Sequence, residues 1–585
     1  MILSASGWRK VFAADEESRS PDLRPADRAL SLGMADVFAS FLADQSPRRP
    51  LRVCVGRDAR FTGPALADGT IRVLLARGIT VDDLGVVAAP EIMAWVQTGG
   101  VHDGFVYISA SHNPVGHNGV KFGLSDGGVV GGKLSAELIA RFRSSVTVEN
   151  AAHWQELAAS AGEAARTVQA KSVQAKQAAA QAYARLGDEI LTLSDDAKVQ
   201  AERKVELAAA VRAKSLGIVG ELNGSARGLS IDKTWLEALG VRVLTLNDRP
   251  GQFVHRIVPE GASLDLCRRE LEKAAAEQPG FALGYVPDCD GDRGNVVWFD
   301  AASGSAQILE AQEVFALGVL AELAGLDYYG HTGKVAVVCN DPTSFRVDAV
   351  AAAFGASVFR AEVGEANVVA LGRALRAEGW TVRIVGEGSN GGNITHPGCV
   401  RDPLSTLGGL IKLLCLDSPQ KPGPFALWCR RSGQAYRAGF TMADVIATLP
   451  RWTTTPASED RAVLKIQSDH ARLKARFEER WPAEWERHLP ELTRRFGIVS
   501  WTELNYEGTE EKAGVGAAFR SGRQTGGLKL VLKDSGGQSS AMLWMRGSGT
   551  EPVFRVMAEV RGHDSDGERR LLEWLTEMVR AADGE

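Results

Sequence analysis

The chain has 585 residues, so about four domains of ordinary size are expected, and its formal net charge of −5 excludes a protein whose whole surface attracts nucleic acid. The 7 cysteines are scattered and form no CxxC pair, which excludes a disulfide framework and a cysteine zinc site. No signal peptide or membrane-spanning run is evident, so a cytoplasmic protein without nucleic-acid or membrane partners is predicted.

Apolar segments of strand length alternate with helix-length segments in the first part of the chain, a rhythm typical of βαβ units with parallel strands. A helix is expected at 63–77, between strands at 52–56, 80–85 and 104–108. The alanine-rich segment from about 151 to 214 favours helix and is predicted to be a helical connector packed between domains.

The same rhythm returns twice, with strands expected at 215–220, 241–246 and 281–286, and again at 334–339, 356–361 and 381–386. After about residue 425 the composition changes. A helix is expected from Glu459 to Phe496, followed by strands at 528–533 and 540–546 and a last helix at 566–581. We therefore predict three α/β domains, residues 1–214, 215–310 and 311–425, and an α+β domain, residues 426–585.

The segment ISASHNPVGHNGVKFG, residues 108–123, places Ser111 in a turn after the apolar strand FVYI. Asn, Pro and Gly fill this turn, as they do in most tight turns. A hydroxyl there would stand outside the end of a strand, where a phosphoryl group could be attached. An ordinary polar loop is the alternative for an isolated S-H-N-P, and three other motifs decide against it.

The first of these is DCDGDR, in which Asp288, Asp290 and Asp292 follow the apolar strand FALGYV. Three carboxylates at alternate positions can converge on one Mg²⁺ ion, which prefers oxygen ligands. An EF-hand is excluded, because the sixth position of an EF-hand loop requires glycine, whereas this chain has Arg293 there. A solvated acidic turn is the remaining alternative, and Arg293 would balance the charge of a metal site.

The second is RGSGTEPVFR, residues 546–555. Its glycines allow backbone N–H groups to face an anion, and arginine binds phosphate in a bidentate way. A polar hairpin turn would explain the glycines but not the two arginines. We predict a phosphate-binding loop made of Arg546, Ser548, Gly549, Thr550 and Arg555.

The third, GEGSNG at 386–391, has the spacing G-x-G-x-x-G of a dinucleotide site. Such a site requires the last glycine to open a helix, and loop residues follow instead, so a Rossmann site is rejected. Glu387 and Ser389 remain as groups suited to sugar hydroxyls.

Together these motifs resemble those of the α-D-phosphohexomutases, the phosphoglucomutase/phosphomannomutase superfamily. Their order along the chain agrees too: A-S-H-N-P resembles the phosphoserine loop, D-x-D-G-D-R the Mg²⁺ loop, G-E-x-S the sugar-specificity loop and R-x-S-G-T-E-P-x-x-R the phosphate-binding loop. The resemblance implies four domains around a central cleft, three with related α/β folds of mixed sheets and helices and a fourth, α+β, that closes over the substrate.

The resemblance also implies a mechanism. Phospho-Ser111 would donate its phosphoryl group to a hexose monophosphate, and the resulting 1,6-bisphosphate, which also serves as activator, would return its other phosphate. Ser111 would join the three aspartates around Mg²⁺. Arg9, His112 and Lys121 match family positions beside the reacting phosphoryl group, and His112 or Lys121 could transfer the proton. Arg293, from the acidic motif itself, could contact the phosphoryl group.

The chain departs from the family pattern in three places, and the first two bear on the sugar preference more than on the reaction type. Gly391 stands where many relatives have a histidine, for which His396 could substitute. The segment 363–367 lacks a basic residue that some relatives have near the substrate phosphate. The alanine-rich segment is longer than expected for the family. We expect a mutase for glucose phosphates first and mannose phosphates second. The alternatives are a phosphoglucosamine mutase, a bisphosphate synthase or phosphatase using the same phosphoserine, and a catalytically silent sugar-phosphate-binding protein. The sequence does not determine the oligomeric state.

Overall fold

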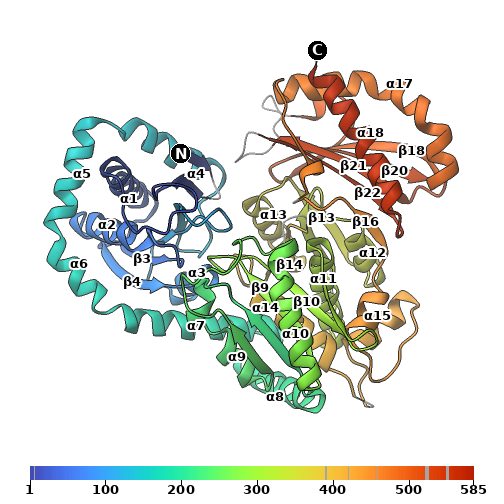
Figure 1. Cartoon of the computed structure of the whole chain (residues 1–585), viewed down its shortest axis with the longest axis horizontal. Helices are drawn as coiled ribbons and strands as arrows, with labels where there is room; N and C mark the ends of the chain where they lie inside the picture. Colours follow the sequence, from blue (N-terminus) through green and yellow to red (C-terminus); the bar gives the residue numbers. More distant parts are fainter. Residues whose placement is uncertain are drawn as a thin grey trace. The chain divides into compact units, whose positions relative to one another are not determined.

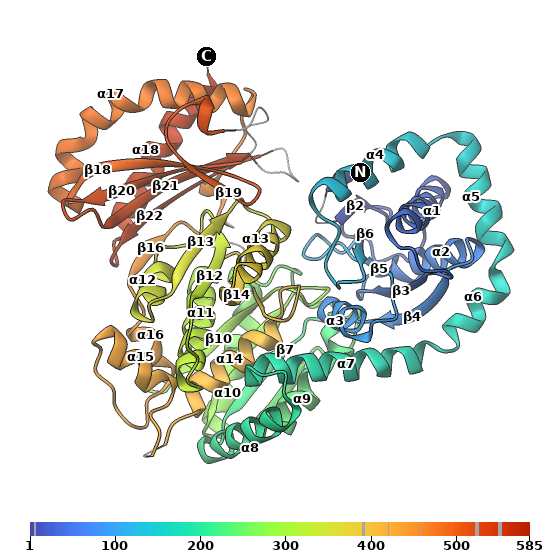
Figure 2. The ribbon, with the colours of Figure 1, turned by 180° about the vertical axis from the view of Figure 1, so that it is seen from behind.

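The computed structural model describes residues 1–4, 7–388, 392–418, 420–457, 459–520, 526–547 and 553–584. The chain forms two compact units (Figures 1 and 2), which we call the first and the second unit. The first comprises Met1–Leu309 and Ile394–Gly423, and the second Glu310–Asn393 and Pro424–Glu585. None of the described helices combines the length and apolar character needed to cross a membrane.

The first sheet has six strands in the order β1-β2-β6-β5-β3-β4. Strand β3 pairs in parallel with β4 and β5, since helices carry the chain back between them, whereas β5 pairs antiparallel with β6. Phe38 of a covering helix stacks on Phe122 of β6 in the core, with ring centroids 4.7 Å apart. The elements are β1 (Ile2–Ser4), β2 (Gly7–Val11), α1 (Pro25–Gln45), β3 (Arg52–Arg57), α2 (Gly63–Ala76), β4 (Thr80–Val86), α3 (Ala89–Gly99), β5 (Gly104–Ile108) and β6 (His117–Leu124).

The alanine-rich segment is helical, as predicted, but much of it covers the first sheet's own helices. Figure 1 shows α5 and α6 curving around them. Trp154 is buried against Gly33 of α1, where an added Cβ would lie 2.5 Å from the indole. Its Nε1 donates to Asp36 Oδ2 at 3.1 Å. The helices are α4 (Gly132–Ser145), α5 (Val148–Ser160), α6 (Gly162–Gln169), α7 (Ser172–Thr192) and α8 (Ala197–Lys214).

The second sheet has the order β11-β10-β9-β7-β8 and completes the first unit with helices and the segment from 394 to 423. Its β7 pairs in parallel with β8 and β9, and β9 pairs antiparallel with β10. The elements are β7 (Gly217–Glu221), η1 (Ala226–Leu229), α9 (Asp232–Ala238), β8 (Arg242–Leu246), η2 (Gly261–Leu264), α10 (Asp265–Glu277), β9 (Phe281–Pro287), β10 (Gly294–Asp300), β11 (Ser305–Ile308) and α14 (Pro403–Cys415).

The third sheet has the order β13-β12-β14-β15. Counted along the chain, its strands have the order 2-1-3-4, the same as β3 to β6 in the first sheet and β7 to β10 in the second. The repeated rhythm of the sequence therefore corresponds to a repeated topology, and the α/β fold class is confirmed. The elements are α11 (Ala311–Tyr328), β12 (Val335–Asn340), α12 (Arg346–Ala353), β13 (Ser357–Ala361), α13 (Glu365–Ala377), β14 (Thr381–Gly386) and β15 (Asn393–Thr395).

The fourth sheet is antiparallel in its main path, and two helices cover one face (Figure 2). The expected helix from Glu459 is wrong at its start: the chain first forms η3 and β17, and the helix begins at His470 after the N-cap Asp469. The elements are α15 (Pro424–Ser432), α16 (Met442–Ala447), β16 (Trp452–Thr454), η3 (Asp460–Ala462), β17 (Val463–Leu464), α17 (His470–Phe496), β18 (Ile498–Glu507), β19 (Glu510–Ala513), η4 (Ala517–Phe519), β20 (Gly527–Asp534), β21 (Ser539–Gly547), β22 (Phe554–Arg561) and α18 (Ser565–Asp583).

Candidate active site

Ser111 lies in the turn between β5 and β6 of the first unit and has a positive φ of 52°. Residues other than glycine rarely adopt this left-handed conformation, and it is common at functional sites. Its backbone N–H donates to Ser109 Oγ at 2.8 Å. The hydroxyl is therefore held at one place outside the end of β5.

The buried side chain of Arg60 binds the backbone of the same turn. The Arg60 guanidinium donates to the carbonyl oxygens of Ser111 and Asn113, each at 2.6 Å, and to that of His117 at 2.9 Å. Its Nε pairs with Asp58 Oδ2 at 3.1 Å, and neither side chain is exposed. With a further bond to the Pro114 carbonyl oxygen at 2.5 Å, one planar cation binds four carbonyl groups between Ser111 and His117.

The acidic loop follows β9, and Asp288 brings it into contact with the serine turn. Ser111 Oγ donates to Asp288 Oδ2 at 2.7 Å, and the backbone N–H of Arg293 donates to Asp288 Oδ1 at 3.1 Å. The loop turns tightly because Gly291 has a φ of 71°, which suits glycine. As a result, one carboxylate oxygen from each of Asp288, Asp290 and Asp292 lies within 4.8 Å of the others.

These three aspartates fit a divalent cation. All are buried, and the Oδ1 atoms of Asp290 and Asp292 have no hydrogen-bond partner among the residues described. Burial raises the pKa of Asp288 well above its usual range, and the other two carboxylates raise it further. Buried carboxylates that repel one another and leave oxygens unpaired are stabilised by a bound cation, and oxygen ligands of this kind suit Mg²⁺.

Lys121 of β6 faces this loop. Its Nζ lies 2.7 Å from Asp290 Oδ2 and 2.9 Å from Asp292 Oδ2. Burial alone would lower the pKa of Lys121, but the two carboxylates outweigh burial and raise it. Lys121 is therefore protonated in this state and can donate a proton or a hydrogen bond.

His112 has the opposite character. Its Nδ1 lies 3.4 Å from Ser111 Oγ. The positive charge of Arg293 and then burial lower the pKa of His112 well below its usual value, and Arg9 adds to this effect. His112 is thus neutral near pH 7 and can accept a proton. Burial, followed by the charge of Arg293, also lowers the pKa of the Arg9 guanidinium.

The residues of the predicted phosphate-binding loop belong to the second unit. Ser548, Gly549 and Thr550 lie outside the described residues. Arg546 and Arg555 are directly opposite each other across the β21–β22 pair. Arg546 donates through Nε and Nη2 to Glu362 Oε1, at 3.2 and 2.9 Å, so a carboxylate partly neutralises one of the two arginines.

The predicted sugar loop follows β14 of the second unit. A strand, β15, and not a helix, comes after its glycines, which agrees with the rejection of a dinucleotide site. Glu387 is buried and its Oε1 accepts the backbone N–H of Gly364 at 2.7 Å. Ser389 and Gly391 lie outside the described residues.

Comparisons with known proteins show what the chain is similar to. Residues 1–148 match the family model described as phosphoglucomutase/phosphomannomutase, alpha/beta/alpha domain I. A phosphoglucomutase/phosphomannomutase of Thermococcus kodakarensis is 28% identical over 540 residues, 92% of this chain and 91% of that protein. A probable phosphoglucosamine mutase of Methanopyrus kandleri is 29% identical over 358 residues, 60% of this chain and 66% of that protein.

A solved structure extends the likeness to the fold of the whole chain. The phosphoglucomutase pp63/parafusin of Paramecium aligns with 100% of this chain and 99% of its own, with a TM-score of 0.63 and 14% identity. This chain is similar to the phosphohexomutases, in domain I by the family model and along most of its length by the Thermococcus relative. A phosphohexomutase is a mutase, an enzyme of the isomerase class.

Three residues near the phosphohexomutase serine turn were not predicted from the sequence. Ser109 donates to Asp290 Oδ2 at 3.0 Å, and Arg401 Nη2 lies 3.5 Å from Asp292 Oδ2. Arg60 is the third. The S-A-S spacing was a usable signal for Ser109, whereas Arg401 and Arg60 are far from their partners in the sequence and carry no local motif.

Proposed function

We propose that this phosphohexomutase interconverts hexose 1-phosphates and hexose 6-phosphates through a phosphoserine at Ser111, with Mg²⁺ held by the acidic loop. The observation that carries the proposal is the 2.7 Å hydrogen bond from Ser111 Oγ to Asp288 Oδ2. It joins the only motif that offers a phosphoryl carrier to the motif that offers a metal site. Asp288, Asp290 and Asp292, with Ser111, would hold the cation.

The reaction balances without another reactant. The P–O bond of phospho-Ser111 breaks as the sugar hydroxyl forms one, which gives a hexose 1,6-bisphosphate; the second phosphate then returns to Ser111 Oγ. A hexose 1,6-bisphosphate would therefore also load the free serine and act as activator. When bound, Mg²⁺ would neutralise the charge of the transferred group.

Two residues with opposite protonation states, His112 and Lys121, are suited to proton transfer. Neutral His112 is suited to accept the proton of the sugar hydroxyl, and protonated Lys121 is suited to donate one to the oxygen that leaves. Arg9 and Arg293 would add positive charge beside the phosphoryl group. In the second unit, Arg546 and Arg555, with the loop between them, would bind the phosphate that does not react.

We propose glucose phosphates as first substrates and mannose phosphates as second. Support comes from the Thermococcus relative, a phosphoglucomutase/phosphomannomutase that matches over 92% of this chain. The Methanopyrus relative, a probable phosphoglucosamine mutase, supports the alternative over 60% of the chain. Glu387 would bind sugar hydroxyls through its carboxylate.

A direct comparison of substrates tests the proposal. Glucose, mannose and glucosamine 1-phosphates are supplied separately with Mg²⁺ and the matching 1,6-bisphosphate, and the 6-phosphates and free phosphate are both measured. We expect kcat/KM to fall in that order, with little free phosphate. Preference for the glucosamine substrate would favour a phosphoglucosamine mutase. Free phosphate equal to or above the isomerised product would instead indicate a phosphatase.

Glu362 offers a further prediction. Its Oε1 accepts two hydrogen bonds from Arg546 and its Oε2 accepts one from the Gly508 backbone N–H at 2.8 Å. Because a neutral amide competes less for the guanidinium, Glu362→Gln should lower KM for the sugar phosphate by about 2- to 5-fold, the worth of one partly exposed charge pair. The rate at saturation should change little.

The matched control is Glu479→Gln, which removes the same charge from an exposed position on α17. It should leave KM unchanged. A raised KM in Glu362→Gln alone would show that Glu362 orients Arg546 for binding and does not compete with the phosphate.

A further inference from the structure

Arg227 of η1 is a fully buried arginine that contacts the acidic loop from outside. Its Nε and Nη2 both donate to the carbonyl oxygen of Gly291, at 3.0 and 2.7 Å. Its Nη1 donates to the Tyr183 hydroxyl at 2.8 Å and pairs with Asp232 Oδ2 at 3.1 Å, and Nη2 pairs with Asp402 Oδ1 at 2.6 Å. One guanidinium thus joins the acidic loop to three other segments of the first unit.

The backbone of the acidic loop is bound at three successive carbonyl groups. The Cys289 oxygen accepts the N–H of Ala226 and the Asp290 oxygen accepts the N–H of Ala89, both at 2.9 Å. Arg227 binds the third, that of Gly291, and a Cβ at Gly291 would lie 2.7 Å from the arginine Nε. The path of the loop between Asp290 and Asp292 is therefore set by the side chain of Arg227.

The charges around this arginine are balanced within the same network. The Tyr183 hydroxyl of α7 donates to Asp402 Oδ1 at 2.8 Å, and the Tyr285 hydroxyl donates to Asp232 Oδ1 at 3.1 Å. Breaking such a buried pair by removing one partner leaves an uncompensated charge. The network consequently has few alternative arrangements.

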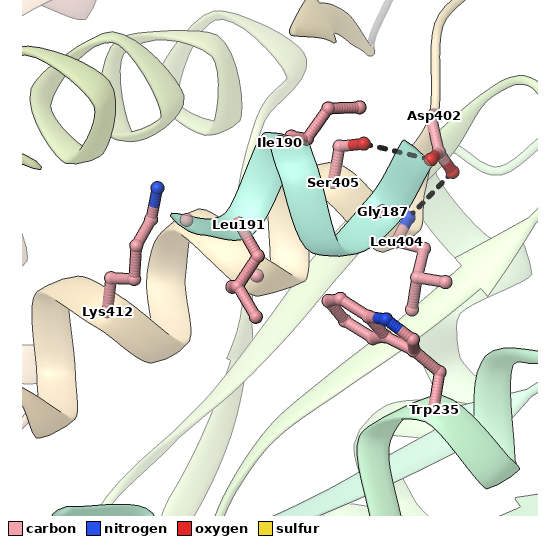
Figure 3. A pocket seen from close by; sticks show the side chains of 10 residues that line it. Gly187, Ile190, Leu191, Trp235, Asp402, Leu404, Ser405 and Lys412 are labelled. Atoms are coloured by element: carbon pink, nitrogen blue, oxygen red, sulfur yellow. Dashed lines mark hydrogen bonds between the residues drawn. The ribbon is translucent and has the colours of Figure 1, made fainter. Parts of the chain in front are cut away.

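Asp402 links the network to the start of α14. It accepts the backbone N–H of Leu404 at 3.0 Å and the hydroxyl of Ser405 at 2.9 Å (Figure 3). In the same view the end of α7 and Trp235 of α9 pack against α14, around a cavity of only about 10 Å³. There is space there for no more than one water molecule, so the helices leave Asp402 little freedom to move.

A second link ties α7 to the same region. Lys176 Nζ lies 2.5 Å from Glu91 Oε1, and Glu91 Oε2 accepts the hydroxyl of Ser230, which directly follows η1. The alanine-rich helix α7 therefore contacts Arg227 of η1 directly through Tyr183 and is linked to Ser230 through Glu91.

From these contacts we infer that Arg227 is a positioning residue for the acidic loop, and that Tyr183 of α7 holds Arg227 in the orientation that binds Gly291. This inference rests on the proposed function in so far as the loop binds a cation. It also gives the alanine-rich segment a role: its helix α7 supports the candidate metal site through the contact of Tyr183 with Arg227. Arg227 touches no reacting atom and acts through the carbonyl between two aspartates.

The test measures cation binding directly, with Mn²⁺ titrated into the full-length protein and free Mn²⁺ followed by electron paramagnetic resonance. Arg227→Lys keeps the charge but not the fork of donors. It should weaken Mn²⁺ binding by about 10- to 100-fold, as loss of residues that orient metal ligands does. Tyr183→Phe keeps the ring and should weaken binding several-fold.

The matched control is Arg383→Lys, at a buried arginine of β14 in the second unit that pairs with Glu322 at 3.2 Å. It should bind Mn²⁺ as the wild type does. In the turnover assay, raising Mg²⁺ about 100-fold should restore most of the rate of Arg227→Lys. A purely structural defect would not respond in this way.

The outcomes distinguish the proposed metal role of the acidic loop from the positioning role of Arg227. Wild-type protein that binds no Mn²⁺ would overturn the proposed metal role, and this inference with it. Wild-type protein that binds Mn²⁺ while both variants bind it equally well would overturn this inference alone. Thermal unfolding shows whether each variant is folded, and if Arg227→Lys does not fold, the result for Tyr183→Phe decides.

Discussion

Replacing Ser111 with alanine should lower turnover by at least about 10⁴-fold, the size of loss seen when a nucleophile is removed. The reason is that Ser111 Oγ is the group proposed to carry the phosphoryl group, and it lies in hydrogen-bond contact with Asp288. Binding of the sugar phosphate should be retained. A coupled assay gives the rate, isothermal calorimetry gives the binding, and intact-protein mass spectrometry reports the phosphoserine after incubation with the 1,6-bisphosphate.

The positive φ at this position calls for a second variant. Alanine keeps the Cβ and with it the strain of about 1 kcal/mol that Ser111 already bears at a φ of 52°, whereas glycine removes it. Ser111→Gly should therefore be as inactive as Ser111→Ala but fold without that strain. Ser144→Ala, at an exposed serine of α4, should be fully active and phosphorylated at Ser111. Normal turnover in either Ser111 variant would refute the proposed carrier.

The second large effect is expected at Asp290. Asp290→Asn keeps the size of the side chain and its capacity to accept from Ser109 or Lys121, but removes one of three negative charges. We expect kcat to fall by about 10²- to 10³-fold and the Mg²⁺ concentration for half activity to rise, because loss of a charged ligand weakens a hard-cation site. Titration of the rate with Mg²⁺, before and after chelation, measures both.

Asp195→Asn, at an exposed position before α8, is the matched control and should behave as the wild type. Wild-type activity that survives complete chelation would exclude the metal role of the acidic loop. A loss of thermal stability in Asp290→Asn comparable to its loss of rate would instead point to a structural role for this carboxylate.

Much of the fold could be predicted because it depends on local pattern. The parallel strands β3, β5, β7, β9, β12 and β14 are apolar runs, and the structure confirms each of them. Strand β6 was not predicted, because its residues include His117, Asn118 and Lys121, which are typical of loops. These polar residues are accommodated because the strand passes the candidate site, where Lys121, in its middle, meets the carboxylates.

In the candidate site, too, the local motifs could be predicted from the sequence, whereas the contacts between distant residues could not be derived from local pattern. Local motifs identified the serine turn and the acidic loop one by one, and only the resemblance to the family implied that they meet; the structure shows a 2.7 Å hydrogen bond between residues 177 positions apart. The protonation states also depend on that folding: Lys121 was a possible base from its position, yet its two carboxylate neighbours keep it protonated. Long-range partners of this kind have no signature in a single sequence.

The shared 2-1-3-4 strand order has a consequence for how this enzyme could change. In all three α/β sheets the link from the third to the fourth strand carries candidate site residues: Ser111 between β5 and β6, the three aspartates between β9 and β10, and Glu387 between β14 and β15. The same link of the repeated topology therefore carries a different proposed role in each of the three sheets. Under the proposed function, substitutions at residues 387–392 would alter the sugar preference while the sheets that hold Ser111 and the aspartates stay unchanged.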